Sequence, residues 1–173
     1  MLTRQISISA PIFLLVYIIQ EAFVSQFRLP GGGFSILMIF ALTWAVLSEF
    51  EVAAVIGFSA GFLMDLSQSA AGPFGQWTLI MLLAGYAISY IGYGDDNVHA
   101  NAIGIVFFVV VANFLVEIAY VASGALLGVS VGSFGQVLIT LIGMSFWALL
   151  ISPIVLPIFT RLHAMIFDSR SAL

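Results

Sequence analysis

The fold is decided by a stretch near the middle of the chain, residues 103–114, which reads IGIVFFVVVANF. It is apolar on every side apart from Asn113. A transmembrane strand alternates apolar and polar residues, and this stretch does not. A helix satisfies its own backbone hydrogen bonds in lipid. The stretch therefore predicts a helix that spans a membrane.

The composition of the whole chain indicates the same surroundings. Of the 173 residues, 62% are hydrophobic and 7% are charged, with a mean hydropathy of +1.21. A soluble domain carries about 25% charged residues. This chain has too few charged side chains to cover the surface of a soluble domain and keep it dispersed in water. Its 4 basic residues, all arginines, are too scattered for a nucleic-acid-binding patch. The chain has no cysteine and only 2 histidines, so disulfides are excluded, and we expect neither a zinc site nor another cofactor.

Six apolar runs follow one another with short loops between them. The second and third runs are short, which predicts tilted or incomplete helices and a vestigial pocket. A cleaved signal peptide is the alternative for the first run, but a small-x-small cleavage site is missing, so we expect an uncleaved span. The sequence therefore predicts a single all-α integral membrane domain, a bundle of six transmembrane helices. The six runs are residues 6–27, 34–50, 52–66, 77–93, 98 to about 127, and 137–159, and a short tail begins at residue 161.

The arginines predict the orientation of this bundle. An even number of spans puts both termini on one side. Arg4, Arg161 and Arg170 then share that side, and Arg28 is alone on the other, so the positive-inside rule places both termini in the cytoplasm. The outer half of the bundle then holds one arginine and three acids: Arg28, Glu21, Asp65 and Glu117.

Two glycines four residues apart, Gly57 and Gly61, form a small-xxx-small step on the third run, in which Phe58 and Phe62 follow the two glycines. Such a step lets two helix backbones approach closely. One reading is packing inside the bundle, and the other is an interface with a partner protein. Both readings remain open from the residues alone.

Asp65 follows Gly61 by four residues and so shares its helical face. A carboxylate at the end of a span needs a hydrogen-bond donor, because both lipid and the helix dipole disfavour its charge. The candidate donors are Arg28 and the free backbone N–H groups near Gly75 and Gln76, at the start of the fourth run. Asp65 either pins the turn between the third and fourth runs or belongs to a ligand or partner site.

Asn113, Glu117 and Tyr120 share one face of the fifth run, because they stand at i, i+4 and i+7. A glutamate inside a membrane span is a candidate functional residue. It could be protonated, bond to a neighbouring helix, or line a pocket. Internal hydrogen bonding and a pocket or interface role carry equal weight here.

The segment Gly92-Tyr-Gly-Asp95 matches the GxGD signature of intramembrane aspartyl proteases. That chemistry needs two carboxylates that share a proton within a few ångströms. The only plausible partner for Asp95 in a neighbouring span is Asp65, but the predicted topology puts the two at opposite membrane faces, and the fourth run separates them by about 25 Å at 1.5 Å per residue. We therefore expect no aspartyl dyad and no enzyme. Asp96 or Asn97 is expected to cap the fifth helix.

The centre of the chain resembles the MreD family of rod shape-determining proteins. The resemblance lies in Val55-Ile-Gly57-Phe-Ser-Ala-Gly61-Phe-Leu-Met-Asp65-Leu, then Phe74-Gly75, then Ala84-Gly-Tyr-Ala87 in the fourth run. The final Pro153-Ile-Val-Leu-Pro157-Ile-Phe-Thr-Arg161 is also similar to the last span of that family with its basic exit. The specific match covers about a quarter of the chain.

This resemblance implies a non-enzymatic scaffold in the bacterial cytoplasmic membrane. Members of the family bind the membrane protein MreC. Through MreC they link cytoplasmic actin-like MreB filaments to the polymerase and transpeptidase that build lateral peptidoglycan. A second copy of the chain is a further candidate partner.

The MreD family is similar in fold to the substrate-binding subunits of energy-coupling-factor vitamin transporters, which supplies an alternative function in small-molecule uptake. Those subunits often carry an Ala-x-x-x-Ala step on the first span, where the coupling partner docks. Ala10 and Ala22 do not form such a step. This departure favours the shape protein.

Overall fold

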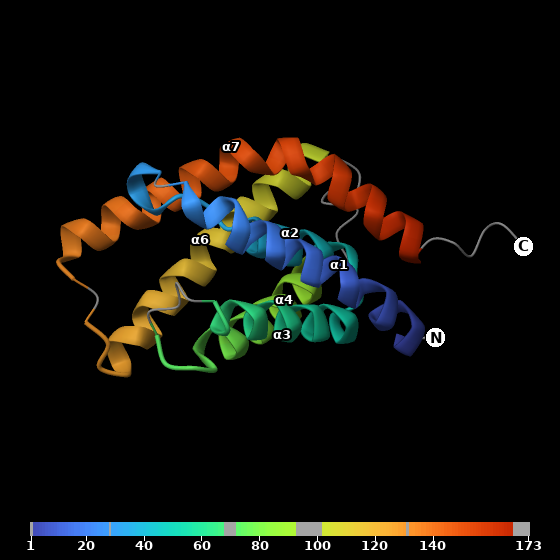
Figure 1. Cartoon of the computed structure of the whole chain (residues 1–173), viewed down its shortest axis with the longest axis horizontal. Helices are drawn as coiled ribbons and strands as arrows, with labels where there is room; N and C mark the ends of the chain where they lie inside the picture. The colour runs from blue at the N-terminus through green and yellow to red at the C-terminus, as the bar shows by residue number, and fades with distance from the viewer. Residues whose placement is uncertain (1, 28, 68–71, 93–101, 131, 168–173) are drawn as a thin grey trace, which may run out of the picture.

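The computed structural model describes residues 2–27, 29–67, 72–92, 102–130 and 132–167. Every regular element in these ranges is helical, so the prediction of an all-α chain is confirmed for them (Figure 1). The elements in chain order are α1 (Leu2–Ala22), the short 3-10 turns η1 (Val24–Gln26) and η2 (Pro30–Gly32), α2 (Ile36–Leu47), α3 (Phe50–Asp65), α4 (Gln76–Gly92), α6 (Ala102–Leu126) and α7 (Phe134–Phe167).

In the part of the chain that the structure describes, four helical stretches are long and apolar enough to cross a membrane: Ser9–Gln26, Pro30–Leu47, Ile103–Leu126 and Phe134–Ile166. The helices α3 and α4 are shorter, with 16 and 17 residues, or about 25 Å each at 1.5 Å per residue. The chain is thus a membrane protein by the length and composition of its helices. The count of six spans remains a prediction.

Helix α2 is the centre of the bundle. Its 10 residues from Leu37 to Val46 are all buried, and it contacts α1, α3, α4, α6 and α7. A helix that is hydrophobic all round must be covered on all sides, and the sequence ILMIFALTWAVL meets that condition. The helix has only 12 residues, so it is about 18 Å long. The hydrocarbon core of a membrane is about 30 Å thick, so α2 alone fills only part of it.

Aromatic rings join α2 to the first and last helices. Phe40 of α2 lies against Phe13 of α1 and Phe159 of α7, and Trp44 of α2 lies against Phe13, with ring centroids 4.8–5.6 Å apart. Trp44 Nε1 also donates a hydrogen bond to the backbone oxygen of Phe159 at 3.2 Å. Aromatic contacts of this kind add to the burial of the rings, so this cluster ties the two ends of the chain to the central helix.

Helices α3 and α4 form a closely packed antiparallel hairpin (Figure 1). Gly57 and Gly61 of α3 face the backbone of α4, and Gly85 of α4 faces the backbone of α3. A Cβ atom placed on Gly61 would lie 2.7 Å from the Cα atom of Thr78, which is too close for any side chain. The glycines therefore let the two backbones touch.

The last helix is longer than the sequence predicted. The apolar run was expected to end at residue 159 with a tail from residue 161, but α7 continues through Pro153 and Pro157 to Phe167. Each proline removes one backbone hydrogen bond, and tertiary contacts hold the helix beyond them. His163, in the added part, is buried, and its Nε2 lies 3.0 Å from Ser48 Oγ at the end of α2.

The connection between α1 and α2 folds onto α7 instead of extending away from the bundle. Gly31, in η2, has a φ of +76°, and a Cβ atom there would lie 2.9 Å from the Cα atom of Gly143 in α7. Trp147 Nε1 donates a hydrogen bond to the backbone oxygen of Pro30 at 3.0 Å. Two glycines are therefore needed for this contact, which keeps the connection against the bundle.

Candidate functional site

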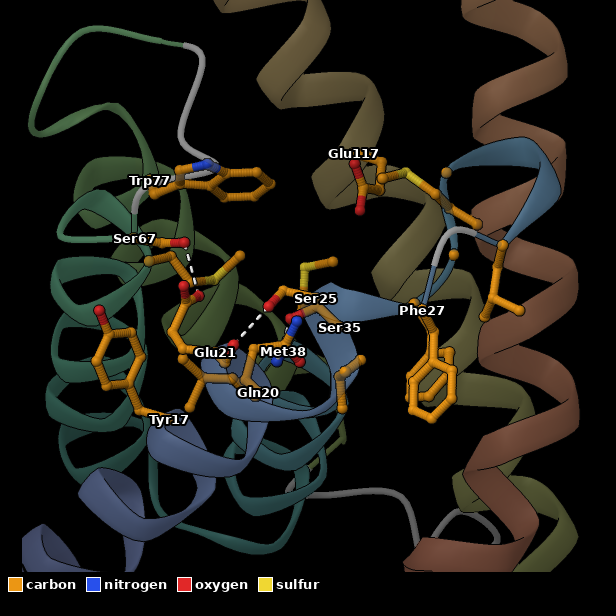
Figure 2. Close-up of a pocket in the computed structure, with 18 of the residues that line it drawn as sticks. Tyr17, Gln20, Glu21, Ser25, Phe27, Ser35, Met38, Ser67, Trp77 and Glu117 are labelled. Carbon is orange, nitrogen blue, oxygen red and sulfur yellow. Dashed lines mark hydrogen bonds between the residues drawn. The ribbon is translucent and has the colours of Figure 1, made fainter.

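A cavity of about 340 Å³ lies where α1 and α3 end and where α2 and α4 begin (Figure 2). It exists because α2 starts only at Ile36, so no helix fills the space beyond its first turn. Its size lies in the range of small-molecule pockets, about 300–1,000 Å³. We call this space the acidic cavity. It is lined by Tyr17, Gln20, Glu21, Val24, Ser25, Phe27, Leu29, Gly32, Gly33, Phe34, Ser35, Leu37, Met38, Met64, Ser67, Trp77, Glu117, Tyr120 and Met144.

Glu117 of α6 is the most deeply buried acid in the lining, with only 5% of its surface exposed. Figure 2 shows its side chain reaching from α6 into the open space of the cavity. No described residue donates a hydrogen bond to its carboxylate. A carboxylate without a donor is costly to bury. This side chain therefore lacks a partner within the described part of the chain.

Glu21, at the end of α1, is the second acid of the cavity. Its Oε1 accepts a hydrogen bond from Ser67 Oγ at 2.7 Å, just after the end of α3. Its backbone oxygen accepts one from Ser25 Oγ at 2.6 Å, and Figure 2 shows both bonds. The serine hydroxyls thus hold the turn after α1 and orient the Glu21 carboxylate beside the cavity.

One wall of the cavity is aromatic. The rings of Trp77, at the start of α4, and Tyr120 of α6 are stacked, with centroids 4.0 Å apart and planes 12° apart. Gln76 supports this pair, because its Nε2 donates hydrogen bonds to the backbone oxygen of Tyr120 and to Ser123 Oγ, both at 2.8 Å. The wall is thereby fixed between two helices that are distant in sequence.

The first turn of α2 forms the base of the cavity. Ser35 caps it, with its Oγ accepting a hydrogen bond from the Met38 backbone N–H at 3.2 Å. Gln20 Oε1 accepts one from the Ile36 backbone N–H at 2.8 Å. Free N–H groups at a helix start favour anions, but these two already have partners in the protein.

Asp65 lies beside the acidic cavity and binds the start of α4. Its Oδ1 accepts a hydrogen bond from the Trp77 backbone N–H at 3.1 Å, and its Oδ2 accepts one from the Thr78 backbone N–H at 2.9 Å. The Thr78 hydroxyl donates a third bond. Of the two kinds of donor considered for Asp65, backbone N–H groups of the fourth run are present. The other candidate, Arg28, lies outside the described residues.

The residues proposed for a packing or partner interface divide into two groups. Gly57 and Gly61 face α4, whereas the side chains of Phe58 and Phe62 are exposed on the outer side of α3. These two rings are stacked with centroids 6.3 Å apart. Gly75 has a φ of +96° and open space around it, so its role is to turn the chain into α4. Of these residues, the two phenylalanines have the most exposed side chains.

The polar face predicted on the fifth run is also divided by the structure. Glu117 and Tyr120 line the acidic cavity, but Asn113 does not. Asn113 is buried, with 2% of its surface exposed. The other residues for which the sequence predicts a role in this part of the chain lie outside the described ranges: Asp95, Asp96 and Asn97.

Several lining residues were not predicted from the sequence. Gln20, Ser25, Ser35 and Ser67 are polar residues at the ends of apolar runs, where polar residues are common for reasons of solvation. Gln20 and Ser67 come together only because α1, α2 and α3 place their ends at one level. The only sequence feature that could have indicated them is that all four stand at run ends on the same predicted side of the membrane.

The charge of the cavity limits its chemistry. Its described lining contains two carboxylates and no lysine, arginine or histidine. No group of three His, Asp or Glu residues in the described ranges is placed to hold a metal ion. The arrangement therefore fits binding of a hydrogen-bond donor or cation by carboxylates.

Comparison with known proteins gives no match to a protein-family model, a curated protein or a solved structure.

Proposed function

We propose that this chain is a non-enzymatic membrane scaffold of the MreD type, which supports rod shape in a bacterium. In this proposal it lies in the cytoplasmic membrane as six spans with both termini in the cytoplasm. It binds an MreC-like protein and, through it, couples actin-like MreB filaments to lateral peptidoglycan synthesis.

The packing of the α3–α4 hairpin carries this proposal. The segment that resembles the MreD family is the one that forms the hairpin, and its Gly57, Gly61 and Asp65 each have a structural contact. Gly57 and Gly61 allow the backbones to touch, and Asp65 holds the start of α4. A motif whose order and spacing are explained by contacts is better support for a resemblance than composition alone.

The six-span arrangement is consistent with the short helices. If α2, α3 and α4 are to cross the membrane at about 18–25 Å each, the connections at their ends must complete the crossing, or the bilayer must thin locally. Non-helical backbone is tolerated at membrane depth where protein covers it. The connection around η2, which packs on α7, meets that condition.

The deciding experiment is depletion of the protein in the bacterium that encodes it, together with purification of a tagged copy. We expect rod-shaped cells to become round and an MreC-like protein to co-purify from the membrane. Rods of normal shape, with no such protein recovered, would contradict the proposal. Expression of the untagged wild-type chain should restore rod shape and serves as the control.

The acidic cavity favours a second candidate, a substrate-binding subunit of an energy-coupling-factor transporter. A pocket of about 340 Å³ is large enough for a small molecule. In this case depletion should leave cell shape normal and abolish the uptake of one vitamin. The same depleted strain therefore separates the two candidates.

A further inference from the structure

We propose that the acidic cavity binds a small organic cation, namely a primary ammonium group on an apolar body, with Glu117 as the carboxylate that holds the ammonium and Glu21 as the second acid of the lining. This inference is independent of the scaffold function. Under the uptake alternative it would state the class of the substrate.

The first argument is the unpartnered carboxylate of Glu117. The side chain is 5% exposed, faces the cavity, and receives no hydrogen bond from any described residue. Buried carboxylates in proteins are paired or hydrogen-bonded. An ammonium group carries three N–H donors and a positive charge, so it would supply the Glu117 carboxylate with both a hydrogen-bond donor and an opposite charge.

The second argument is the sign of the charge around the cavity. Glu21 lies in the same lining, with Ser67 donating to its Oε1 and the hydroxyl of Ser35 near the base. The described lining has no basic side chain. The first turn of α2, which could attract an anion, has N–H groups already bonded to Gln20 and Ser35. An anionic ligand would therefore meet two like charges, which is the kind of repulsion that gives selectivity.

The third argument is the aromatic wall. Trp77 and Tyr120 are stacked in the lining, and Phe27 and Phe34 also contribute to it. Ring faces attract cations, and the rings give an apolar body a surface to contact. The ligand that fits the cavity is thus amphiphilic, with a charged end and an apolar end.

The test is calorimetric titration of the full-length protein purified in a maltoside detergent, which carries no ammonium group. The probes are butylammonium and 2-phenylethylammonium, each compared with the alcohol of the same shape. We expect each ammonium to bind at one site at least about tenfold more tightly than its alcohol, because a charge-assisted bond replaces a neutral one.

Glu117→Gln keeps the shape of the side chain and removes its charge. We expect it to weaken ammonium binding about 10- to 100-fold and to remove most of the preference for the ammonium over the alcohol. The matched control is Glu51→Gln, an exposed acid in the first turn of α3, which should bind as the wild type does. If Glu117→Gln does not give a monodisperse protein, Glu21→Gln and the wild-type contrast between ammonium and alcohol decide the question.

Three results would overturn the proposal. One is equal binding of ammonium and alcohol by the wild type. Another is ammonium binding that is the same in Glu117→Gln as in the wild type. The third is binding that appears only in Arg28→Ala, since Arg28 would then be the native partner of Glu117.

The ammonium could belong to a free amine or to the headgroup of phosphatidylethanolamine. Adding phosphatidylethanolamine to the micelles separates the two sources, with phosphatidylglycerol as the control lipid. Competition by phosphatidylethanolamine alone identifies the headgroup as the occupant. Undiminished probe binding in its presence identifies a free amine.

Discussion

At the scale of single residues, Asp65 shows how one carboxylate can hold a helical turn inside a membrane protein. The backbone N–H groups at the start of a helix have no partners within that helix, and here two of them donate to Asp65. The charge also lies at the positive end of the α4 dipole. The carboxylate thus receives hydrogen-bond donors, and the backbone N–H groups at the start of α4 receive an acceptor, in a place with little water.

We expect Asp65→Ala to lower the free energy of unfolding by about 1–3 kcal/mol, because two backbone donors and the Thr78 hydroxyl lose their acceptor. Thr78→Val should cost less, since it removes only one of the three bonds. Thermal unfolding in detergent measures both, with exposed Glu51→Ala as the control. An Asp65→Ala protein as stable as the control would show that these bonds contribute nothing.

The contrast between Asp65 and Glu117 shows how far reasoning from sequence can reach at this scale. The donors of Asp65 could be predicted because they lie 12 and 13 residues away, across a single turn. The surroundings of Glu117 could not, because they come from α1, α2 and the connection between them. For this reason the sequence does not distinguish internal hydrogen bonding from a pocket role for Glu117. The structure places Glu117 in the lining of a cavity.

At the scale of elements, the α3–α4 hairpin depends on the absence of side chains along its seam. Gly57, Gly61 and Gly85 lie where a Cβ atom would meet the backbone of the other helix. Backbone atoms cannot move aside as a flexible side chain can. Any larger residue must therefore push the two helices apart.

We expect Gly57→Val to prevent normal packing of the hairpin and to reduce the yield of monodisperse protein severalfold. The matched control is Gly135→Ala in α7, where nothing lies within 4 Å of the added atom. That control should be neutral or stabilise by up to about 1 kcal/mol, because alanine favours a helix over glycine. Size-exclusion chromatography after detergent extraction gives the comparison, and equal profiles for the two variants would contradict this account of the seam.

The lengths of the elements were predicted unevenly. The hairpin helices were close to the predicted runs, because a turn sequence with glycine and proline limits them on one side. Helix α2 is shorter than the predicted run at 34–50, because Ser35 is its N-cap and Ser48 is its C-cap. Helix α7 lengthened because His163 finds a buried partner in Ser48, a contact between residues that are 115 positions apart. Apolar periodicity carries no information on such contacts.

At the scale of the whole molecule, the bundle presents apolar faces outward, as a protein surrounded by lipid does. One such face is on the outer side of the hairpin, where Phe58 and Phe62 are stacked and Phe74 contacts Phe62 edge to face, with centroids 5.9 Å apart. Since the glycines and Asp65 are engaged within the hairpin, this aromatic face is the part of the predicted interface that remains available to a partner.

If the proposed scaffold function holds, Phe58→Ala combined with Phe62→Ala should reduce recovery of the MreC-like protein severalfold and leave the membrane level of the chain unchanged. The reason is that aromatic side chains account for much of the binding energy at protein interfaces. Phe107→Ala removes a ring on α6 that is more exposed, 68% against 47% for Phe58 and 41% for Phe62, and it is the control. Equal recovery of the MreC-like protein with the double variant and with Phe107→Ala would show that the interface lies on another face of the chain.

The burial of α2 also has a consequence for biosynthesis. Its partners include α7, which supplies the acceptor for the Trp44 indole and the histidine beside Ser48 and which leaves the ribosome after the other described helices. Before α7 is synthesised, one side of α2 is uncovered. With 12 residues, α2 is too short to span the hydrocarbon core of the membrane by itself. Membrane insertion and tertiary assembly are therefore coupled in this chain, and a nascent chain arrested before residue 134 should remain open to the proteases of membrane quality control.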